Sequence, residues 1–272
     1  MSGFRRGDCA TIPATAIELG KSGLSAASSR TVYYFGTCLA DLLYPEAGLA
    51  GMELLRREGV KVVYPAAQTC CGQPAWNSGY RDEARRVAAR QISCFPEPHP
   101  VVVPSGSCAG MLKHHYPRLF AGDPMQPAAE ALAARVFELT EYLVDILAYH
   151  PADLGPPVKV AVHSSCSARR EMGVADRIEK LVADLENVTC VEQAYKAECC
   201  GFGGTFSIKQ PEISTDMVRD KCSALRTAGA DVVVSQDCGC LMNIGSAFDA
   251  AGDRIASMHI AQFLWERTSG TD

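Results

Sequence analysis

Cysteine is the residue type in this sequence whose number and spacing most clearly indicate chemistry. The chain of 272 residues contains 13 cysteines, and an odd number cannot be paired completely within one chain. Arg5 and Arg6 near the N-terminus are not followed by a continuous apolar stretch, so we expect no secretory signal and a cytoplasmic protein. Because cytosolic proteins rarely keep disulfides, clustered cysteines in such a chain indicate metal or redox chemistry.

The cysteines occur in two copies of one pattern. In each copy a cysteine follows an apolar run, a Cys-Cys-Gly motif comes next, and another cysteine follows a Val-Val-Val run. The corresponding cysteines lie 128, 129 and 132 residues apart: Cys38 and Cys166, Cys70 and Cys199, Cys108 and Cys240. Three landmarks in the same order with nearly the same offset indicate an internal duplication.

The residues between the cysteines fit alternating helices and strands. Cys38 and Cys70 are separated by 31 residues and Cys166 and Cys199 by 32, which suits a βαβ unit of roughly 30 residues or more. Periodicity predicts helices over 49–57, 82–92, 178–185 and 211–228, and strands over 60–64, 101–103, 188–191 and 232–234. Each cysteine group then follows a strand. Parallel strands joined by right-handed crossovers end at one edge of the sheet, where open α/β folds bind ligands. We therefore expect the cysteines of each copy to converge.

The predicted fold is α/β, with two pseudo-symmetric Rossmann-like cysteine-rich domains and mostly parallel sheets. The Pro- and Gly-rich segment 150–157 is expected to join them. This places an N-terminal extension at 1–30, the first domain at 31–150 and the second at 158–268. Residues 128–149 are expected to form one long amphipathic helix that closes the first half, and residues 255–267 to close the second.

The amino-acid composition of the chain argues against nucleic acid as a partner and against a membrane-spanning segment. Lys and Arg number 26 against 31 Asp and Glu, a net charge of −5 without a long basic run, which argues against nucleic acid. No run approaches the ~18 consecutive apolar residues of a membrane span. Hydrophobic residues make up 47% of the chain, enough for a sizeable core.

The spacing of the sulfurs favours a multinuclear metal site. Thiolates bind zinc, copper(I) and iron–sulfur clusters, and structural zinc sites usually contain two C-x2-C pairs. Here the close pairs are Cys70-Cys71, Cys199-Cys200 and Cys238-x-Cys240. Vicinal side chains diverge, so they suit different metals of one cluster, and Gly72 and Gly201 allow a tight bend that brings backbone N–H groups to sulfur. An iron–sulfur cluster is therefore favoured, with zinc as the alternative at either site.

Longer motifs surround these cysteines: YYFGTC (Tyr33 to Cys38), TCCGQPAWNSG (Thr69 to Gly79), PSGSCAGM (Pro104 to Met111), ECCGFGG (Glu198 to Gly204) and DCGCLMNIG (Asp237 to Gly245). They resemble the CCG cysteine-rich domain family. That family includes the B component of heterodisulfide reductase, the iron–sulfur component of glycolate oxidase and the C component of anaerobic glycerol-3-phosphate dehydrogenase. Across roughly residues 31–265 the chain is most similar to its lactate utilisation protein A branch.

The resemblance implies a subunit, not active alone, of a system that oxidises L-lactate to pyruvate together with partner proteins B and C. In the heterodisulfide reductase relative, five cysteines hold each non-cubane [4Fe–4S] cluster. By position, the resemblance implies a first site of Cys38, Cys70, Cys71 and Cys108, and a second site of Cys166, Cys199, Cys200, Cys238 and Cys240. Met111 stands where the family has its last cysteine, and the second motif closes with C-x-C. A four-cysteine cubane cluster or a zinc ion therefore remains open for the first site.

Two other functions stay open at this stage. One is a thiol/disulfide redox protein of the heterodisulfide reductase type, and the other is a zinc-stabilised structural adaptor. His163 could reach a cluster or a substrate carboxylate, although we expect a structural role for it. The cysteines outside the repeat are expected to be structural: Cys9, Cys94, Cys190 and Cys222.

Overall fold

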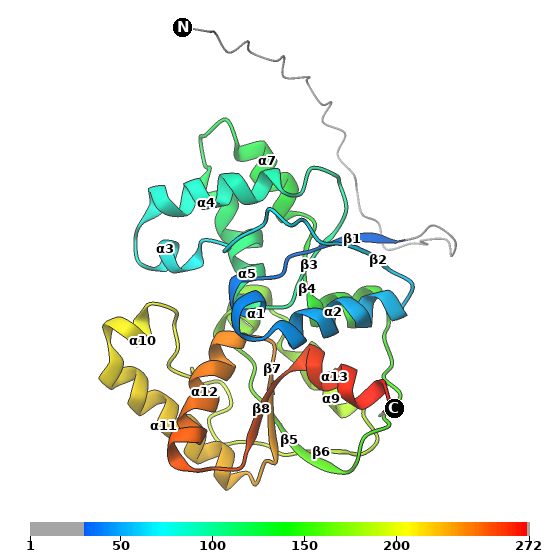
Figure 1. Cartoon of the computed structure of the whole chain (residues 1–272). Helices are drawn as coiled ribbons and strands as arrows, with labels where there is room; N and C mark the ends of the chain where they lie inside the picture. Colours follow the sequence, from blue (N-terminus) through cyan, green and yellow to red (C-terminus); the bar gives the residue numbers. More distant parts are fainter. Residues whose placement is uncertain (1–29, 271–272) are drawn as a thin grey trace, which may run out of the picture.

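The computed structural model describes residues 30–270 and contains two four-stranded, all-parallel sheets. Their strand orders are β2-β1-β3-β4 and β6-β5-β7-β8, so the second sheet repeats the topology of the first. Figure 1 shows the two halves one above the other, with helices packed around each sheet. The predicted α/β class and the duplication are confirmed.

The first half contains these elements: β1 (Thr31–Tyr34), α1 (Cys38–Leu43), α2 (Pro45–Arg57), β2 (Lys61–Val63), α3 (Gln73–Asn77), α4 (Arg81–Ser93), β3 (Val101–Val103), α5 (Gly106–Gly110), the π-helix η1 (Met111–His115), α6 (Tyr116–Leu119), α7 (Gln126–Ala133), β4 (Val136–Glu138), α8 (Leu139–Glu141) and the π-helix η2 (Tyr142–Ile146).

The second half contains these elements: β5 (Val158–Val162), the π-helix η3 (Ala168–Met172), α9 (Ala175–Ala183), β6 (Val188–Cys190), α10 (Phe206–Lys209), α11 (Pro211–Thr227), β7 (Val232–Ser235), α12 (Cys238–Ala251), β8 (Ala256–His259) and α13 (Ile260–Thr268).

The inner strands are Val-rich because helices cover both faces of each sheet. Val101, Val102 and Val103 of β3 are fully buried, as expected for a parallel strand shielded on both sides. In the first sheet β1 pairs with β3 through Tyr33 and Val101. In the second, β5 pairs with β7 through Val160 and Val232. These corresponding registers bring the strand ends of each half to one edge.

The prediction of one long helix over residues 128–149 is wrong. The segment instead forms α7, the strand β4, α8 and η2. Val136, Phe137 and Glu138 pair with Val101, Val102 and Val103, completing the sheet beside β3. The β-branched and aromatic side chains of Val136 and Phe137 suit a strand, and this pairing overrides the helical period of the surrounding residues. Likewise, the segment predicted to close the second half divides into β8 and α13.

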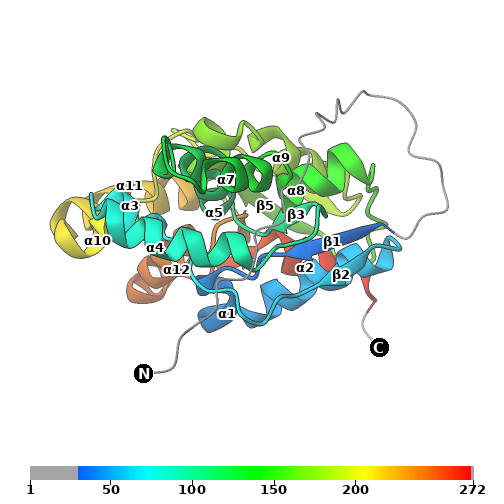
Figure 2. The same cartoon turned by 90° about the horizontal axis from the view of Figure 1, so that it is seen from above.

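The two halves share contacts well beyond the joining segment. Helix α13 of the second half packs against α2 of the first, and Figures 1 and 2 show the two helices side by side. Near the end of α13, the Arg267 guanidinium donates to both carboxylate oxygens of Asp153, each at 2.8 Å. Both side chains are buried, so this pair fixes the Pro-rich joint to the C-terminal helix.

The predicted N-terminal extension falls, apart from Arg30, outside the described residues. Within residues 30–270, none of the helices combines the length and apolar character needed to cross a membrane.

Candidate metal centre

The predicted cysteines follow the carboxyl ends of the inner strands and of β2 and β6. Cys38 opens α1 just after β1, and Cys108 lies in α5 just after β3. In the second half Cys166 follows β5, and Cys240 lies in the first turn of α12 after β7. The Cys-Cys-Gly loops follow β2 and β6. The expected convergence at one sheet edge therefore occurs in both halves.

In the first half, four thiols form a continuous set of contacts. Cys70 interacts with Cys38 and Cys71, and Cys71 in turn interacts with Cys108. Hydrogen bonds from the thiols of Cys38 and Cys71 lower the pKa of Cys70 to about 3, despite its burial. The hydrogen bond to Cys70 raises the pKa of Cys38, and bonding to Cys108 raises that of Cys71. One sulfur of the set therefore takes the thiolate form that binds metals.

The second half repeats this arrangement. Cys199 interacts with Cys166 and Cys200, and Cys200 interacts with Cys240. Hydrogen bonds from Cys166 and Cys200 lower the pKa of Cys199 to about 2. Cys199 thus corresponds to Cys70 in both sequence and charge state.

The glycine of each Cys-Cys-Gly motif has the role that the sequence predicts. Gly72 and Gly201 adopt left-handed conformations, with φ of 87° and 86°. Their N–H groups donate to the Sγ atoms of Cys70 and Cys199, each at 3.4 Å. A Cβ at Gly201 would lie 2.6 Å from the carbonyl oxygen of Ser214, so only glycine fits that turn.

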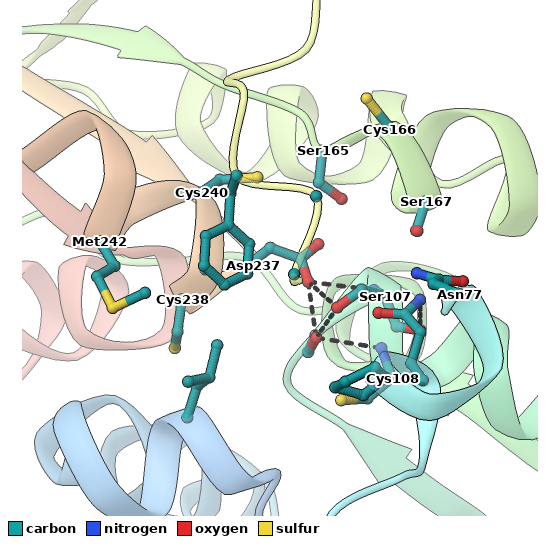
Figure 3. Close-up of a pocket in the computed structure, with 18 of the residues that line it drawn as sticks. Asn77, Ser107, Cys108, Ser165, Cys166, Ser167, Asp237, Cys238, Cys240 and Met242 are labelled. Atoms are coloured by element: carbon teal, nitrogen blue, oxygen red, sulfur yellow. Dashed lines mark hydrogen bonds between the residues drawn. The ribbon is translucent and has the colours of Figure 1, made fainter. Parts of the chain in front are cut away.

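Cys238 differs from the other eight predicted cysteines. It is buried and lies two residues before Cys240, and it interacts electrostatically with Cys240 and Cys108, but its thiol makes no hydrogen bond to another thiol among the described residues. Figure 3 shows its side chain pointing away from that of Cys240. The corresponding residue of the first half is Gly106, so each half contributes a set of four contacting thiols.

One cavity of about 560 Å³ connects the two sets. All nine predicted cysteines line it, together with hydroxyl and amide side chains such as those of Thr37, Asn77, Ser165 and Ser167. Figure 3 shows residues of both halves around this space. Cys94, Cys190 and Cys222 are not among the lining residues, in agreement with their expected structural role, and Cys9 lies outside the described residues.

Asp237 occupies the boundary between the two sets. Its Oδ1 accepts hydrogen bonds from the hydroxyls of Ser105 and Ser107, each at 2.7 Å, and from the Ser107 N–H at 3.1 Å. Figure 3 shows this carboxylate between Cys108 and Cys240. Its Oδ2 is buried and has no hydrogen-bond partner among the described residues. Among the described residues that line the cavity, Asp237 is the only Asp, Glu, Lys or Arg.

Sequence reasoning missed Asp237, and the structural role expected for His163 stays a prediction. Asp237 corresponds to Ser105 in the repeat, and that substitution of a hydroxyl by a carboxylate was the available signal. His163 is 1% exposed, and a ring nitrogen lies with the Sγ atoms of Cys200 and Cys240 in a group whose members are all within 4.8 Å of one another. Burial lowers its pKa to about 3, and Lys221 contributes, so the ring is neutral.

The donor chemistry fits a metal centre. Each half offers four sulfurs, a number that matches the Cys₄ ligation of iron–sulfur clusters as well as a tetrahedral zinc site. The N–H groups directed at Cys70 and Cys199 match the backbone hydrogen bonds that cluster ligands receive. The nitrogens of His163, which are buried and have no hydrogen-bond partner among the described residues, also fit a donor role at the second site.

Comparison with known proteins places these motifs in a family. The cysteine-rich (CCG) domain matches residues 32–113 and 160–245. Lactate utilization protein A of Exiguobacterium sp. is 43% identical over 238 residues, covering 86% of this chain and 97% of that protein. The protein of that name from Oceanobacillus iheyensis is 45% identical, with 86% and 96% covered.

Among solved structures, a hypothetical protein from Helicobacter pylori superimposes with a TM-score of 0.59 at 11% identity, over 90% of this chain and 50% of that one. That likeness concerns the fold alone. The two matches to the cysteine-rich domain, together with more than 40% identity over nearly the full length of the relatives, show that the chain belongs to the lactate utilization protein A family of CCG proteins.

Proposed function

We propose that this chain is the iron–sulfur electron-transfer component of a complex that oxidises L-lactate to pyruvate, working with partner proteins B and C. The name shared by its relatives, lactate utilization protein A, supports lactate as the substrate of that system. The observation that carries the proposal is the placement of two sets of four contacting thiols on the wall of one cavity.

Two one-electron sites match the electron count of this oxidation. Converting a hydroxy acid to a keto acid releases two electrons, which a flavin or nicotinamide normally accepts. A bound [4Fe–4S] cluster takes up and returns electrons singly. Cys38, Cys70, Cys71 and Cys108 would hold one such group, and the corresponding four thiols of the second half would hold the other. We assign the primary acceptor of the hydride equivalent to a partner protein.

The negative charge of the cavity wall argues against lactate binding in the cavity, and it therefore supports an electron-transfer role for this site. Lactate is an anion, and binding it in a buried site calls for a cation or several strong donors. Asp237 is negative, thiolates add further negative charge, and the described residues that line the cavity include no Arg, Lys or His. Lactate would therefore meet repulsion beside the thiols.

The proposal is tested by anaerobic purification of the full chain with iron, acid-labile sulfide and zinc analysis. We expect iron and sulfide in equal amounts and a visible absorbance that bleaches on reduction. Lactate should bleach it only when proteins B and C are added. Zinc at both sites without visible absorbance would remove the relay function.

A zinc-stabilised adaptor is the second candidate, because one observation favours it. His163, Cys200 and Cys240 offer three ligand atoms within 4.8 Å of one another, and Cys199, which lies outside that group of three, would complete the Cys₃His set typical of structural zinc sites. Zinc at the second site alone, with iron at the first, would be a mixed outcome that leaves one electron carrier. The metal analysis therefore separates the two candidates site by site.

Thiol/disulfide chemistry makes a different prediction. A cavity of about 560 Å³ is within the ~300–1,000 Å³ that small-molecule sites occupy. If the isolated, iron-loaded chain reduces a disulfide substrate at a sustained rate without proteins B and C, the relay is not its main function. We expect no such turnover.

A further inference from the structure

His163 is a buried imidazole without a hydrogen-bond partner among the described residues. It follows β5 directly, and its backbone N–H donates to the carbonyl of Val234 at 2.8 Å, which fixes its position at the sheet edge. The side chain is 1% exposed, and neither Nδ1 nor Nε2 is paired within residues 30–270. Leaving such a group buried and unpaired destabilises the folded protein. A bonding partner that the protein chain does not itself supply would offset that destabilisation.

The surroundings of the ring indicate what kind of partner it has. One ring nitrogen and the Sγ atoms of Cys200 and Cys240 lie within 4.8 Å of one another. The ionisable groups that act on it are Lys221, Cys199 and Arg169. A neutral imidazole has a free nitrogen lone pair and is the form that binds metals.

The first half has no counterpart of this nitrogen. The offset of 128 residues that relates Cys38 to Cys166 places Phe35 at the position of His163. Phe35 is fully buried, and its ring lies 6.0 Å from that of Phe95, measured between centroids. An apolar aromatic ring fills this place beside the first set of thiols, whereas an imidazole fills it beside the second.

We propose that His163 is a metal ligand, so that the second site has nitrogen and sulfur donors while the first is bound by sulfur alone. This inference requires only one part of the proposed function, namely that the second set of thiols binds a metal. Replacing thiolate by imidazole ligation raises the reduction potential in other iron–sulfur centres. With the imidazole in the place of one of the four thiolates of the second set, the two sites would differ in potential, with the second the more easily reduced, which gives the relay a direction.

Isotope labelling tests the bond itself. The full chain, produced with ¹⁵N-histidine and loaded anaerobically, is reduced and examined by pulsed EPR. We expect one strongly coupled ¹⁵N nucleus in the wild-type protein. It should be absent in His163→Phe, which introduces the residue of the first half, and retained in His99→Phe, which alters an aromatic neighbour of Tyr33.

Redox titration supplies a second readout. Wild-type protein should show two resolved midpoint potentials. The difference between these two potentials should become smaller in His163→Phe. If zinc occupies the second site, ¹⁵N NMR of the same labelled protein should show one metal-shifted imidazole nitrogen instead. Should His163→Phe fail to fold, the labelled wild-type protein still decides the question.

The outcomes separate the two proposals. Iron–sulfur clusters at both sites with no coupled nitrogen, or with only the weak coupling of a hydrogen-bonded ring, overturn the role of His163 and leave the electron-transfer function standing. Absence of any bound metal overturns both.

Discussion

The thiol sets give a direct test at the level of single residues. Cys200 is buried and contacts both Cys199 and Cys240, so Cys200→Ser removes the centre of the second set. We expect iron content to fall to about half, because a Cys₄ cluster loses one ligand while the first site is untouched. Lactate-dependent growth should be lost. Iron analysis and complementation of a deletion strain measure the two effects.

Cys222→Ser is the matched control. Cys222 is also buried, but its thiol donates to the carbonyl of Ile244 at 3.8 Å, and burial raises its pKa to about 11. Because the Cys222 thiol is neutral and acts only as a hydrogen-bond donor, a serine hydroxyl can take its place. If Cys222→Ser loses as much iron as Cys200→Ser, the assignment of the second site is wrong.

Cys238 distinguishes a site of five sulfurs from a site of four. Its thiol lies outside the contact set, and Gly106 stands at the corresponding position of the first half. We therefore expect Cys238→Ala to retain the iron content and visible spectrum of the wild-type protein, contrary to the ligand role that the family resemblance implies. Loss of the second cluster in this variant would restore the five-cysteine assignment.

Much of the candidate site can be predicted at the level of single residues. Cysteines that recur at a fixed spacing usually do so because they bind a common group. All nine predicted cysteines line the cavity. Asp237 and His163 were harder to predict, since aspartate and histidine are common at strand ends and helix starts. What sets them apart is that Oδ2 of Asp237 and both ring nitrogens of His163 are buried without a hydrogen-bond partner among the described residues, which no spacing reveals.

At the scale of elements, close packing of α5 positions the first site against the second half. A Cβ on Gly106 would lie 2.7 Å from the Cβ and 2.9 Å from the Cα of Ala168 in η3. We expect Gly106→Ala to push the two elements apart and to destabilise the protein by about 1–3 kcal/mol, as overpacking does. Because Cys108 lies two residues later, metal content should fall as well. Urea unfolding and iron analysis measure both effects.

Gly48→Ala supplies the comparison within another helix. A Cβ at Gly48 in α2 would meet no atom within 4 Å. Alanine is favoured over glycine in a helix by up to about 1 kcal/mol, so this variant should be as stable as the wild type or slightly more so. Equal destabilisation of both variants would mean that the contact with Ala168 is not the cause.

Helices could be predicted from the sequence where the hydrophobic period of the segment itself determines its conformation. The helix expected at 82–92 is α4, and the one expected at 211–228 is α11, within a residue or two at each end. Strand β4 was missed because its conformation depends on pairing with β3, whose register joins Phe137 to Val102. A helical pattern in sequence carries no information about such a distant partner.

At the scale of the whole molecule, the two halves behave as one packed body. One hydrophobic cluster combines side chains of both, including Leu54 of α2 and Leu264 of α13, each fully buried. The division into domains at 31–150 and 158–268 therefore stays a prediction about evolutionary units. The repeated cysteine motifs predict the duplication. They do not predict which faces of the two halves pack together to form the shared core.

The contribution of Glu138 to the stability of this body should decrease with rising pH, in the opposite sense to the groups whose pKa the fold lowers. This residue ends β4, is fully buried, and accepts hydrogen bonds from the N–H groups of Thr140 and Glu141. Burial raises its pKa to about 8 from a normal value near 4.5. Between these values the folded protein holds a proton that the unfolded chain releases, so unfolding is favoured as pH rises.

The expected size of the effect follows from that difference. Each pH unit in this interval weakens the contribution of Glu138 to folding by about 1.4 kcal/mol, or ~3 kcal/mol from pH 5 to pH 7. Glu138→Gln keeps an acceptor oxygen but cannot ionise, so its free energy of unfolding should fall less over that range than that of the wild type. Glu130→Gln, which alters an exposed carboxylate, should retain the wild-type slope. Urea unfolding at several pH values compares the three proteins, and identical slopes for all of them would show that Glu138 is ionised in the folded state.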